Sequence, residues 1–541
     1  MSDQKAPEKA GAPEKTKVGS RAFVRRERAA VRRRTARRTR QTAGPQSRGA
    51  TALLELSLVR ALRRIPRAAL VCALVACLNA ICWSIVTPAF EVPDEPAHFA
   101  YVKQLAETGT LPWSKTGDFS SEELGTLIGL DYYKVRQQPQ DRSLAAHVQQ
   151  LVLDREMQLS ARESEKGSAA AGAATGEPPL YYALEAIPYT LARGGTVLTR
   201  LQLMRIFSAL LAGVTAMFAF LFLREALPRE PWAWTVGGLA VALVPLLGFM
   251  SGAVNPDAML FAVSTVVFYW FARAFRRGMT LRGAVAIGAL TAIGLLTKLN
   301  FVGLVPGIVL GVLVLGARVA RTSRRSALGM LALALGIGLS PALVYGAINV
   351  LSNHPLFGVA SVTANLMKGS ILAELDYVWQ LFLPRLPGTA HDFPGLFTTR
   401  QLWFDGYVGL FGWLDTTFPA WVYDVALIPA GAIALLCGRA LVAGRAALRS
   451  RAVELAVYAT IGIGLLVLVG VTSYQNFPTV DAETAQARYL LPLLALLGAV
   501  VALAARGAGR RWGPAAGTLI VVLFLAHDIF SQMLVAARFY G

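Results

Sequence analysis

Long apolar segments recur along the 541 residues of this chain and alternate with short polar turns. A helix of about 20 mainly apolar residues crosses the hydrocarbon core of a bilayer, so each segment of this kind predicts one crossing. The predicted crossings are residues 68–86, 202–223, 232–250, 258–273, 283–298, 301–317, 327–350, 424–438, 455–472, 488–505 and 516–535. The pattern therefore predicts an all-α polytopic membrane protein with about eleven transmembrane helices.

Two long polar regions, residues 89–201 and 351–422, interrupt this alternation. Within the first, GEPPLYYALEAIPYTLARGG at residues 176–195 has the length of a crossing. If it crossed, the four arginine-rich loops that follow would all lie outside, against the tendency of Lys and Arg to stay in the cytoplasm. We therefore expect this segment to be an interfacial helix and both polar regions to lie on the outer face of the plasma membrane.

The composition agrees with a membrane protein and locates its positive charge. The chain is 55% hydrophobic and 16% charged, with a formal net charge of +20. Residues 1–70 hold 19 Lys and Arg against 5 Asp and Glu, which is +14 of that total. We expect residues 1–66 to form a disordered cytoplasmic arm near anionic lipid, and not to bind nucleic acid, because the arm abuts the first crossing and has a single aromatic residue, Phe23.

The rest of the chain divides into a transmembrane module at 67–350, with its outer loop at 89–201, the outer region at 351–422, and C-terminal transmembrane helices at 423–541. The four cysteines form no C-x-x-C pair, which argues against a zinc ribbon or a disulfide framework. The sequence contains no nucleophile elbow, phosphate-binding loop of the Walker type or dinucleotide fingerprint. An enzyme that works on the outer face without these must therefore take a substrate that arrives already activated.

The most informative polar stretch is TPAFEVPDEPAHFAY, residues 87–101, directly after the first crossing. Asp94 and Glu95 are flanked by prolines, and His98 follows three residues later. Pro96 suits the first position of a helix, which puts Glu95 near the cap and Asp94 just outside it, and this helix is expected to stop near Gly109 and Pro112. Carboxylates beside hydrocarbon are costly, so the pair indicates a site. The alternative is acidic capping of an ordinary interfacial helix.

Further polar residues fall at the predicted outer ends of the crossings: Glu177, Asn255, Asp257, Lys298, Gln486 and Arg488. Lys298 and Arg488 are isolated cations at span ends, where a lipid phosphate or pyrophosphate is a suitable anionic partner. The alternative is that both side chains reach ordinary lipid head groups. Asp94, Glu95 and His98 also raise the possibility of a bound divalent cation, although one histidine with two carboxylates is a weak metal signature.

The order of these features resembles the GT-C superfamily of polytopic membrane glycosyltransferases, which includes protein mannosyltransferases and the aminoarabinose transferase of lipid A. The sequences PDEPAHF (93–99), PPLYY (178–182), NPD (255–257) and QARYLLP (486–492) are similar, more narrowly, to a bacterial membrane family placed beside them. The resemblance covers roughly residues 70–505 and leaves out the basic arm.

This resemblance implies a GT-C-like fold and inverting transfer of a sugar from a polyprenyl-phosphate donor to a glycan, lipid or protein acceptor at the outer face. It implies Asp94 as the general base with Glu95 beside it, and Lys298 and Arg488 at the donor phosphate. The expected substrate-binding residues are His98, Glu177, Tyr181, Tyr182, Asn255, Asp257, Gln486 and Tyr489.

Two other functions fit the pattern. A transporter or flippase of a lipid-linked glycan would have ionisable residues at mid-membrane depth, and His527 and Asp528 lie near the middle of the last crossing. The alternative is that the pair forms hydrogen bonds to a neighbouring helix. A non-catalytic membrane scaffold would use the outer loops as a binding surface and tolerate changes at Asp94, Lys298 and Arg488.

Overall fold

A computed structural model describes residues 65–112, 119–143, 147–160, 174–354, 356, 370–389, 391, 393, 398–480 and 485–541. The expected basic arm, residues 1–66, lies almost entirely outside the described residues. Residues Arg67–Gly541 form one unit, distinct from Met1–Pro66.

Within the described residues, nine helices are long and apolar enough to cross a membrane. They are α3 (Arg67–Val86), α9 (Val197–Ala226), α12 (Asp257–Arg277), η2 with α14 (Leu299–Leu304 and Val305–Ala320), α15 (Arg324–Leu351), α19 (Ala420–Ala443), α21 (Ala452–Val480), η4 with α22 (Ala487–Leu493 and Leu494–Gly507) and α23 (Gly513–Tyr540). The predicted crossing at 283–298 is the shorter helix α13 (Leu281–Leu295). Each predicted crossing is therefore helical, and the predicted class of all-α polytopic membrane protein is confirmed.

The predicted crossing at 232–250 is broken into two helices. α10 (Pro231–Ala242) and α11 (Pro245–Ser251) meet at an angle of 54°. Pro245 stands at the start of α11, where its ring and missing N–H prevent α10 from continuing. The break turns α11 toward the segment that precedes Asp94, so that Gly248 packs against the ring of Trp83.

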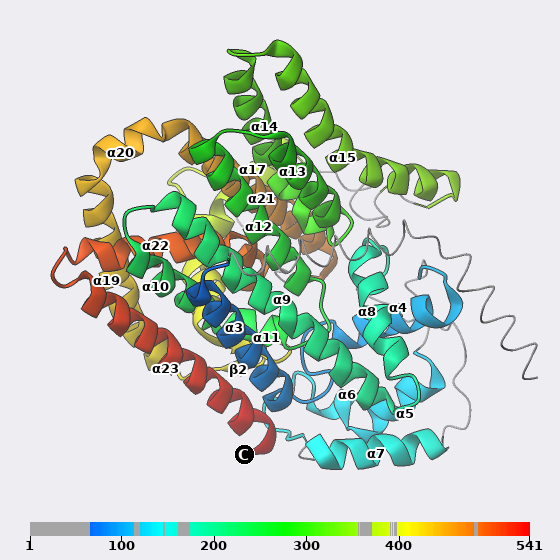
Figure 1. The fold of residues 1–541 in the computed structure, drawn as a ribbon. Helices are drawn as coiled ribbons and strands as arrows, with labels where there is room; N and C mark the ends of the chain where they lie inside the picture. Colours follow the sequence, from blue (N-terminus) through cyan, green and yellow to red (C-terminus); the bar gives the residue numbers. More distant parts are fainter. Residues whose placement is uncertain are drawn as a thin grey trace, which may run out of the picture. The chain divides into compact units, whose positions relative to one another are not determined.

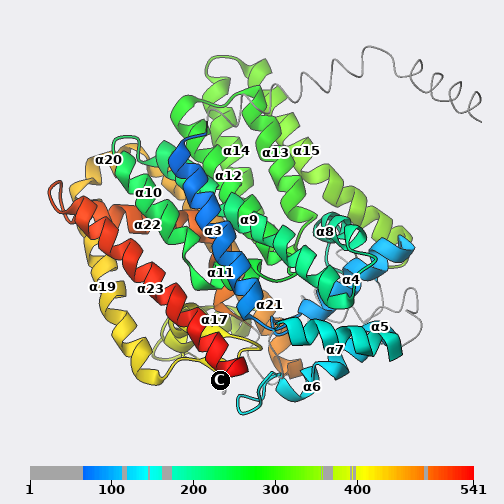
Figure 2. The same cartoon turned by 60° about the horizontal axis from the view of Figure 1, so that its bottom comes forward.

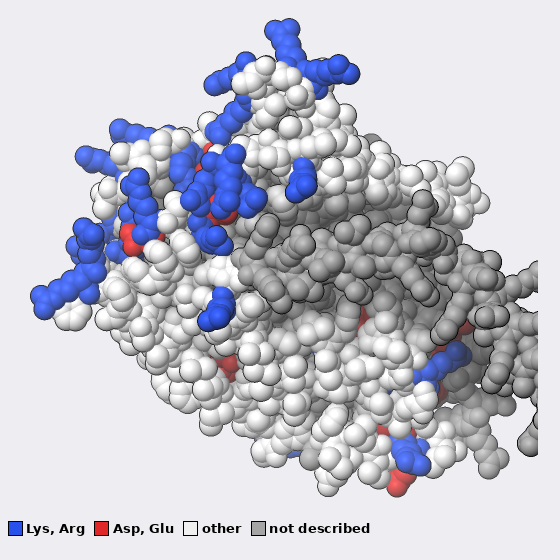
Figure 3. Space-filling view, viewed as in Figure 1, with Lys and Arg blue, Asp and Glu red and all other residues white. Residues whose placement is uncertain are grey.

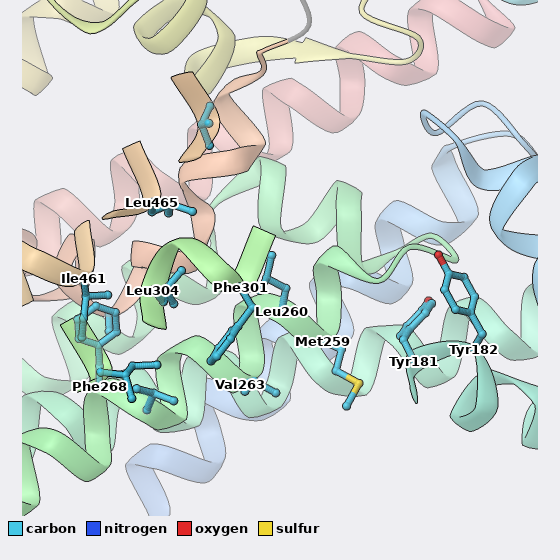
Figure 4. Packing of buried hydrophobic residues seen from close by; sticks show 14 of the residues in the cluster. Tyr181, Tyr182, Met259, Leu260, Val263, Phe268, Phe301, Leu304, Ile461 and Leu465 are labelled. Atoms are coloured by element: carbon cyan, nitrogen blue, oxygen red, sulfur yellow. The ribbon is translucent and has the colours of Figure 1, made fainter. Parts of the chain in front are cut away.

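The core forms around α9, which packs against α3, α10 and α12 (Figures 1 and 2). Its continuation between α12, η2 and α21 is aliphatic and aromatic, with Phe268, Phe301, Leu304 and Ile461 nearly or fully buried (Figure 4). Tyr181 and Tyr182 close the same cluster at its other end (Figure 4). The core therefore reaches the region where the predicted site residues lie.

Short helices cover one end of the bundle. From the first polar region come α4 (Glu95–Thr108), α5 (Ser121–Gly129), α6 (Tyr132–Val135), α7 (His147–Ser160) and α8 (Leu180–Leu191). The second supplies α17 (Ile371–Phe382), η3 (Arg400–Asp405), α18 (Gly406–Gly409) and a hairpin of β1 (Leu410–Phe411) and β2 (Thr416–Thr417), paired antiparallel with Leu410 opposite Thr417. The segment predicted to be interfacial contains the twelve-residue helix α8, which is not among the candidate spans.

The basic side chains gather elsewhere. In Figure 3 most of the Lys and Arg on the visible face lie at the top and upper left, where Figure 1 shows the turn between α14 and α15 and the short helix α20 (Arg445–Ser450). The helices α5, α6 and α7 lie at the lower right of Figure 1. The arginine-rich turns at α20 and between α14 and α15 therefore lie apart from α5, α6 and α7, which are helices of the first polar region.

Candidate functional site

The segment between α3 and α4 is held by Arg205, a buried side chain of α9. Its guanidinium donates to the backbone carbonyls of Ser84, Thr87 and Pro88 at 2.9–3.0 Å. It also donates to both carboxylate oxygens of Glu95, at 2.8 Å and 2.6 Å. These bonds fix the path of the chain from the end of the first span to the start of α4.

Glu95 is fully buried and accepts two more hydrogen bonds, from the backbone N–H groups of Phe90 and Val254, each at 3.0 Å. Both of its oxygens therefore have two donors. A carboxylate with four bonds inside the protein is well suited to holding the fold together, since a buried charge is tolerated only when it is paired and hydrogen-bonded.

Asp94 has a different environment from its neighbour. It is the N-cap of α4, with φ of 67°, and its side chain makes no capping bond. The helix therefore begins one residue earlier than predicted, because Pro96 occupies its second position and not its first. The helix ends at Gly109, as predicted, whose φ of 71° suits a left-handed C-cap. The Asp94 carboxylate, freed from capping, is 30% exposed.

Four of the predicted residues form a row of alternating charges. Nη2 of Arg488 donates to Oδ2 of Asp94 at 3.2 Å, and Nε of Arg488 lies 3.9 Å from Oδ2 of Asp257. The other oxygen of Asp257 pairs with Nζ of Lys298 at 2.8 Å. In these pairs Arg488, Asp257 and Lys298 are each less than a tenth exposed, so Asp94 is the accessible end of the row.

The row depends on four separate segments. Asp94 caps α4, Asp257 opens α12, Lys298 precedes η2, and Arg488 is the second residue of η4. The row brings together the starts of α12, η2 and η4. The turn before α12 is closed by Asn255, whose Oδ1 accepts from the N–H of Asp257 at 3.0 Å. The first turn of α12 also carries the positive end of the helix dipole, which favours an acid at Asp257.

The electrostatics keep Asp94 ionised. Burial would raise the pKa of this carboxyl, but Arg488, His98 and Lys298 outweigh it and hold the pKa of Asp94 below its ordinary value. His98 is 3% exposed, and burial lowers its pKa to about 3, so the imidazole is neutral at physiological pH. Its Nδ1 lies 2.9 Å from the hydroxyl of Tyr182.

The other predicted binding residues of the PPLYY segment surround the row and are largely enclosed. Tyr182 stacks on Tyr101 with ring centroids 3.7 Å apart, and the Tyr181 hydroxyl lies 2.8 Å from that of Ser208. Both Tyr181 and Tyr182 are fully buried. Glu177 accepts from the N–H of Leu299 at 3.4 Å, and burial raises the pKa of Glu177 despite the nearby Lys298.

The remaining predicted residues lie on the Arg488 side and around Pro93. Asn255 is fully buried and its Nδ2 donates to the carbonyl of Pro93 at 3.4 Å. The ring of Tyr489 lies 5.4 Å from the guanidinium of Arg488. Oε1 of Gln486 is buried and has no hydrogen-bond partner among the described residues. Asn255 therefore supports the loop that carries Asp94, and Gln486 keeps an unused acceptor beside Arg488.

A small pocket adjoins Arg488. Its lining is mostly apolar and comprises Pro93, Leu246, Phe249, Met250, Gly406, Leu410, Leu414, Gln486, Ala487 and Arg488. Nη1 of Arg488 lies 3.8 Å from the sulfur of Met250, a weak acceptor in this wall. The pocket thus combines a cationic end with an aliphatic body.

Sequence reasoning missed Arg205 and the apolar wall. Arg205 is an arginine within a long apolar helix, and that placement was an available signal of a buried partner. The wall is formed by α11 and by Gly406–Leu414, which approach each other only after the break at Pro245 and the turn of the hairpin. A contact between segments so far apart in the sequence cannot be predicted from a local sequence pattern.

His527 and Asp528, which the sequence offered as an indication of transport, form hydrogen bonds to neighbouring helices. Oδ1 of Asp528 accepts from Nδ2 of Asn79 at 3.2 Å and from Nε1 of Trp83 at 3.0 Å, and Gln532 donates to its other oxygen at 3.0 Å. Nε2 of His527 lies 2.5 Å from the carbonyl of Val408. These bonds join α23 to α3 and to α18.

Comparison with known proteins gives a family and a distant structural likeness. No curated protein matches the chain. Two crystal structures of the Archaeoglobus fulgidus oligosaccharyltransferase, one in the apo form and one tethered to an acceptor peptide, align with TM-scores of 0.41 and 0.40 at 11% and 10% identity. Each alignment covers 87% of this chain and 56% or 55% of the other, so the chain spans just over half the length of that protein. A likeness at this level assigns neither fold nor function.

The family model described as "Predicted membrane protein (DUF2142)" matches residues 77–497. This span begins within α3, ends within α22 and includes Asp94, Asp257, Lys298 and Arg488. The chain therefore belongs to the DUF2142 family of predicted membrane proteins.

Proposed function

We propose that this protein is a membrane glycosyltransferase that moves a sugar from a polyprenyl-phosphate donor to an acceptor hydroxyl, with inversion. The observation that carries the proposal is the row Asp94–Arg488–Asp257–Lys298, in which an ionised, accessible carboxylate lies beside two cations. General-base catalysis requires the first, and stabilisation of a departing phosphate requires the second.

In the proposed reaction the acceptor oxygen attacks the anomeric carbon of the donor. The new C–O bond forms as the bond from that carbon to the phosphate oxygen breaks, and Asp94 takes the proton of the acceptor hydroxyl. The electron pair of the broken bond leaves on the polyprenyl phosphate, whose charge increases where Arg488 and Lys298 lie. Attack from the face opposite the phosphate inverts the anomeric configuration.

The geometry favours Asp94 over Glu95 as the base. Glu95 is fully buried, and each of its oxygens already accepts two hydrogen bonds. The side chain of Asp94 is 30% exposed, and among the described residues its carboxylate accepts a single hydrogen bond, from Arg488. A base must reach the proton that it removes, so the accessible carboxylate is the better candidate.

The pocket beside Arg488 gives the donor a place. A polyprenyl phosphate is an anion joined to a hydrocarbon chain, which matches a guanidinium at the end of an apolar wall. The acceptor, a glycan, lipid or protein, would approach the exposed side of Asp94. In this proposal the site faces the extracytoplasmic side of the plasma membrane, with the arginine-rich turns in the cytoplasm.

The reaction is proposed without a metal. In the described part of the chain no group of three or more His, Cys, Asp or Glu is arranged to hold an ion. Asp94 and Asp257 already have cationic partners, and His98 is oriented by Tyr182. These residues therefore do not fit the divalent cation that the sequence left open.

The test uses the full-length protein in lipid nanodiscs with labelled polyprenyl-phosphate sugars and candidate acceptors. We expect sugar transfer, or slow hydrolysis in the absence of an acceptor, to depend on Asp94, with Asp94→Asn at least about 100-fold slower. Full activity of a folded Asp94→Asn variant would reject Asp94 as the base. Movement of the labelled lipid across proteoliposomes without any sugar transfer would favour the flippase instead.

A further inference from the structure

The hairpin β1–β2 and the preceding helix α18 supply one wall of the pocket beside Arg488, through Gly406, Leu410 and Leu414. A two-residue ladder has little stability of its own, so something else must fix its place. Inside the hairpin, the Gly412 φ of 58° and the closeness of the Asp415 carboxylate leave no room for a side chain at position 412. The turn is therefore tightly packed within itself, but the position of the hairpin depends on contacts with other parts of the protein.

The first such contact is with α23. Nη2 of Arg538 donates to Oδ2 of Asp415 at 2.8 Å, and the two side chains are only 5% and 7% exposed. Arg538 also donates to the backbone carbonyl of Val135, the last residue of α6, and to those of Gln138 and Asp141 in the segment that follows. One arginine thus joins the last helix, the first polar region and the hairpin.

Further contacts hold the hairpin to the Asp94 segment, to the residue after α6, and to α3 and α11. Nε1 of Trp413 donates to the carbonyl of Phe90 at 3.1 Å, four residues before Asp94. The guanidinium of Arg136 lies 3.7 Å from the centre of the Trp413 ring, a cation–π contact. Phe411 is fully buried between the rings of Trp83 and Phe249, at 5.0 Å and 5.4 Å.

The same helix α23 fixes the start of this wall. The ring nitrogen Nε2 of His527 lies 2.5 Å from the carbonyl of Val408 in α18. Because a carbonyl only accepts, Nε2 carries the proton in this bond. His527 and Arg538 therefore hold the two ends of the segment Val408–Asp415, and Leu410 and Leu414 lie between them.

We propose that Arg538 is a positioning residue that, through Asp415, sets the wall of the pocket and thereby the affinity for the apolar part of the substrate. It lies on the last helix and contacts none of Asp94, Asp257, Lys298 or Arg488 in the bonds described above. The half of this inference that concerns substrate rests on the proposed function. The half that concerns the wall rests on the contacts of Arg538 alone.

The experiment has a readout that is independent of activity. In a full-length background in which the four native cysteines are replaced, Thr416→Cys places a small thiol on β2, where residue 416 is 2% exposed. Reaction with a water-soluble maleimide reports opening of the hairpin. Asp415→Asn removes the charged partner of Arg538, and Asp424→Asn is the matched control, because Asp424 pairs with Arg400 at an exposed site.

We expect Asp415→Asn to speed labelling of residue 416 at least about tenfold. Removing one partner of a buried ion pair leaves the charge of Arg538 uncompensated, which destabilises the closed position of the hairpin. Asp424→Asn should label as the parent does. Affinity for a long-chain polyprenyl phosphate should fall in Asp415→Asn while the rate at saturating donor changes less. Arg538→Lys, which keeps the charge, should lie between the parent and Arg538→Met.

Unchanged labelling in both Asp415→Asn and Arg538→Met would overturn the inference. Faster labelling with unchanged lipid affinity would overturn the positioning role. If the parent binds no polyprenyl phosphate, the proposed function fails, and the labelling result still decides whether Arg538 holds the wall.

Discussion

Oδ2 of Asp94 lies 3.2 Å from Nη2 of Arg488, a residue 394 positions later in the chain. The contact joins the cap of α4 to the start of η4, and it leaves the rest of the Asp94 carboxylate exposed. The adjacent acid, Glu95, is paired with Arg205 instead, so the two neighbouring carboxylates have different partners.

Asp94→Asn should abolish sugar transfer while leaving the protein folded. The amide keeps the shape and the contact with Arg488 but cannot accept a proton, so the rate should fall at least about 100-fold. Asp94→Glu should retain partial activity. Transfer assays in nanodiscs, with a thermal melt of each variant, measure both effects, and an active Asp94→Asn would exclude the assignment.

Glu95→Gln and Arg205→Met should each destabilise the protein. Removal of one partner from a buried, hydrogen-bonded ion pair costs about 3–5 kcal/mol, because the other charge stays buried without compensation. The double substitution should cost less than the sum of the two single ones. Thermal or denaturant unfolding in detergent measures this, with the exposed Arg400→Gln as a control that should change little. Additive effects would mean that the pair is not coupled.

Arg488→Lys should weaken donor binding. A lysine cannot bond Asp94 and present a second nitrogen to the pocket at the same time. The loss of one hydrogen bond to a charged group, about 1.5 kcal/mol, corresponds to roughly tenfold in the dissociation constant. Calorimetry with a polyprenyl phosphate gives that constant directly. Equal affinity in the parent and the variant would argue against Arg488 as a phosphate ligand.

Glu91 should make stability depend on pH. Burial, with help from Asp415, raises the pKa of Glu91 to about 8, although Arg538 opposes this. The unfolded chain ionises near 4.3, so the stabilisation is complete below that pH and is lost as the pH rises through 8. The melting temperature should therefore fall from pH 6 to 9 more steeply in the parent than in Glu91→Gln. Parallel curves would contradict this.

Asp528→Leu should loosen α23 without stopping transfer. The carboxylate accepts from Asn79, Trp83 and Gln532. Asn79 and Gln532 have second acceptors, the carbonyl of Ala242 and Oδ1 of Asn79, so the main cost is the loss of the acceptor of Trp83 Nε1, about 1–3 kcal/mol for a buried group. Asp424→Asn again serves as the exposed control. A transporter that needed Asp528 as a proton carrier would lose function completely in Asp528→Leu at a temperature where the protein remains folded.

The sequence predicted those features that depend on local pattern. Apolar length located the helices, and Gly109 ended α4 where expected, since both are properties of neighbouring residues. Carboxylates and cations at span ends selected Asp94, Asp257, Lys298 and Arg488, which the structure brings into one row. These four residues stood out in the sequence because charge beside hydrocarbon is costly wherever it occurs.

What could not be predicted depends on contacts between distant segments. The difference between Asp94 and Glu95 comes from Arg205, which lies 110 positions after Glu95. The enclosure of Tyr181 and Tyr182 follows from packing against Ser208, His98 and Tyr101. The pocket wall requires both the break at Pro245 and the hairpin, and the sequence of neither segment indicates that the two lie in contact.

The contact between Asp94 and Arg488 also has a consequence for biosynthesis. A ribosome completes Asp94, Asp257 and Lys298 long before it reaches Arg488, so nine of the eleven apolar segments are made before the row has its central cation. Until η4 is inserted, Asp94 lacks its guanidinium partner and the pocket lacks its charged end. The chain therefore acquires a complete site only late in its synthesis, and a nascent or truncated form that ends before residue 487 should be unable to act on lipid-linked sugar.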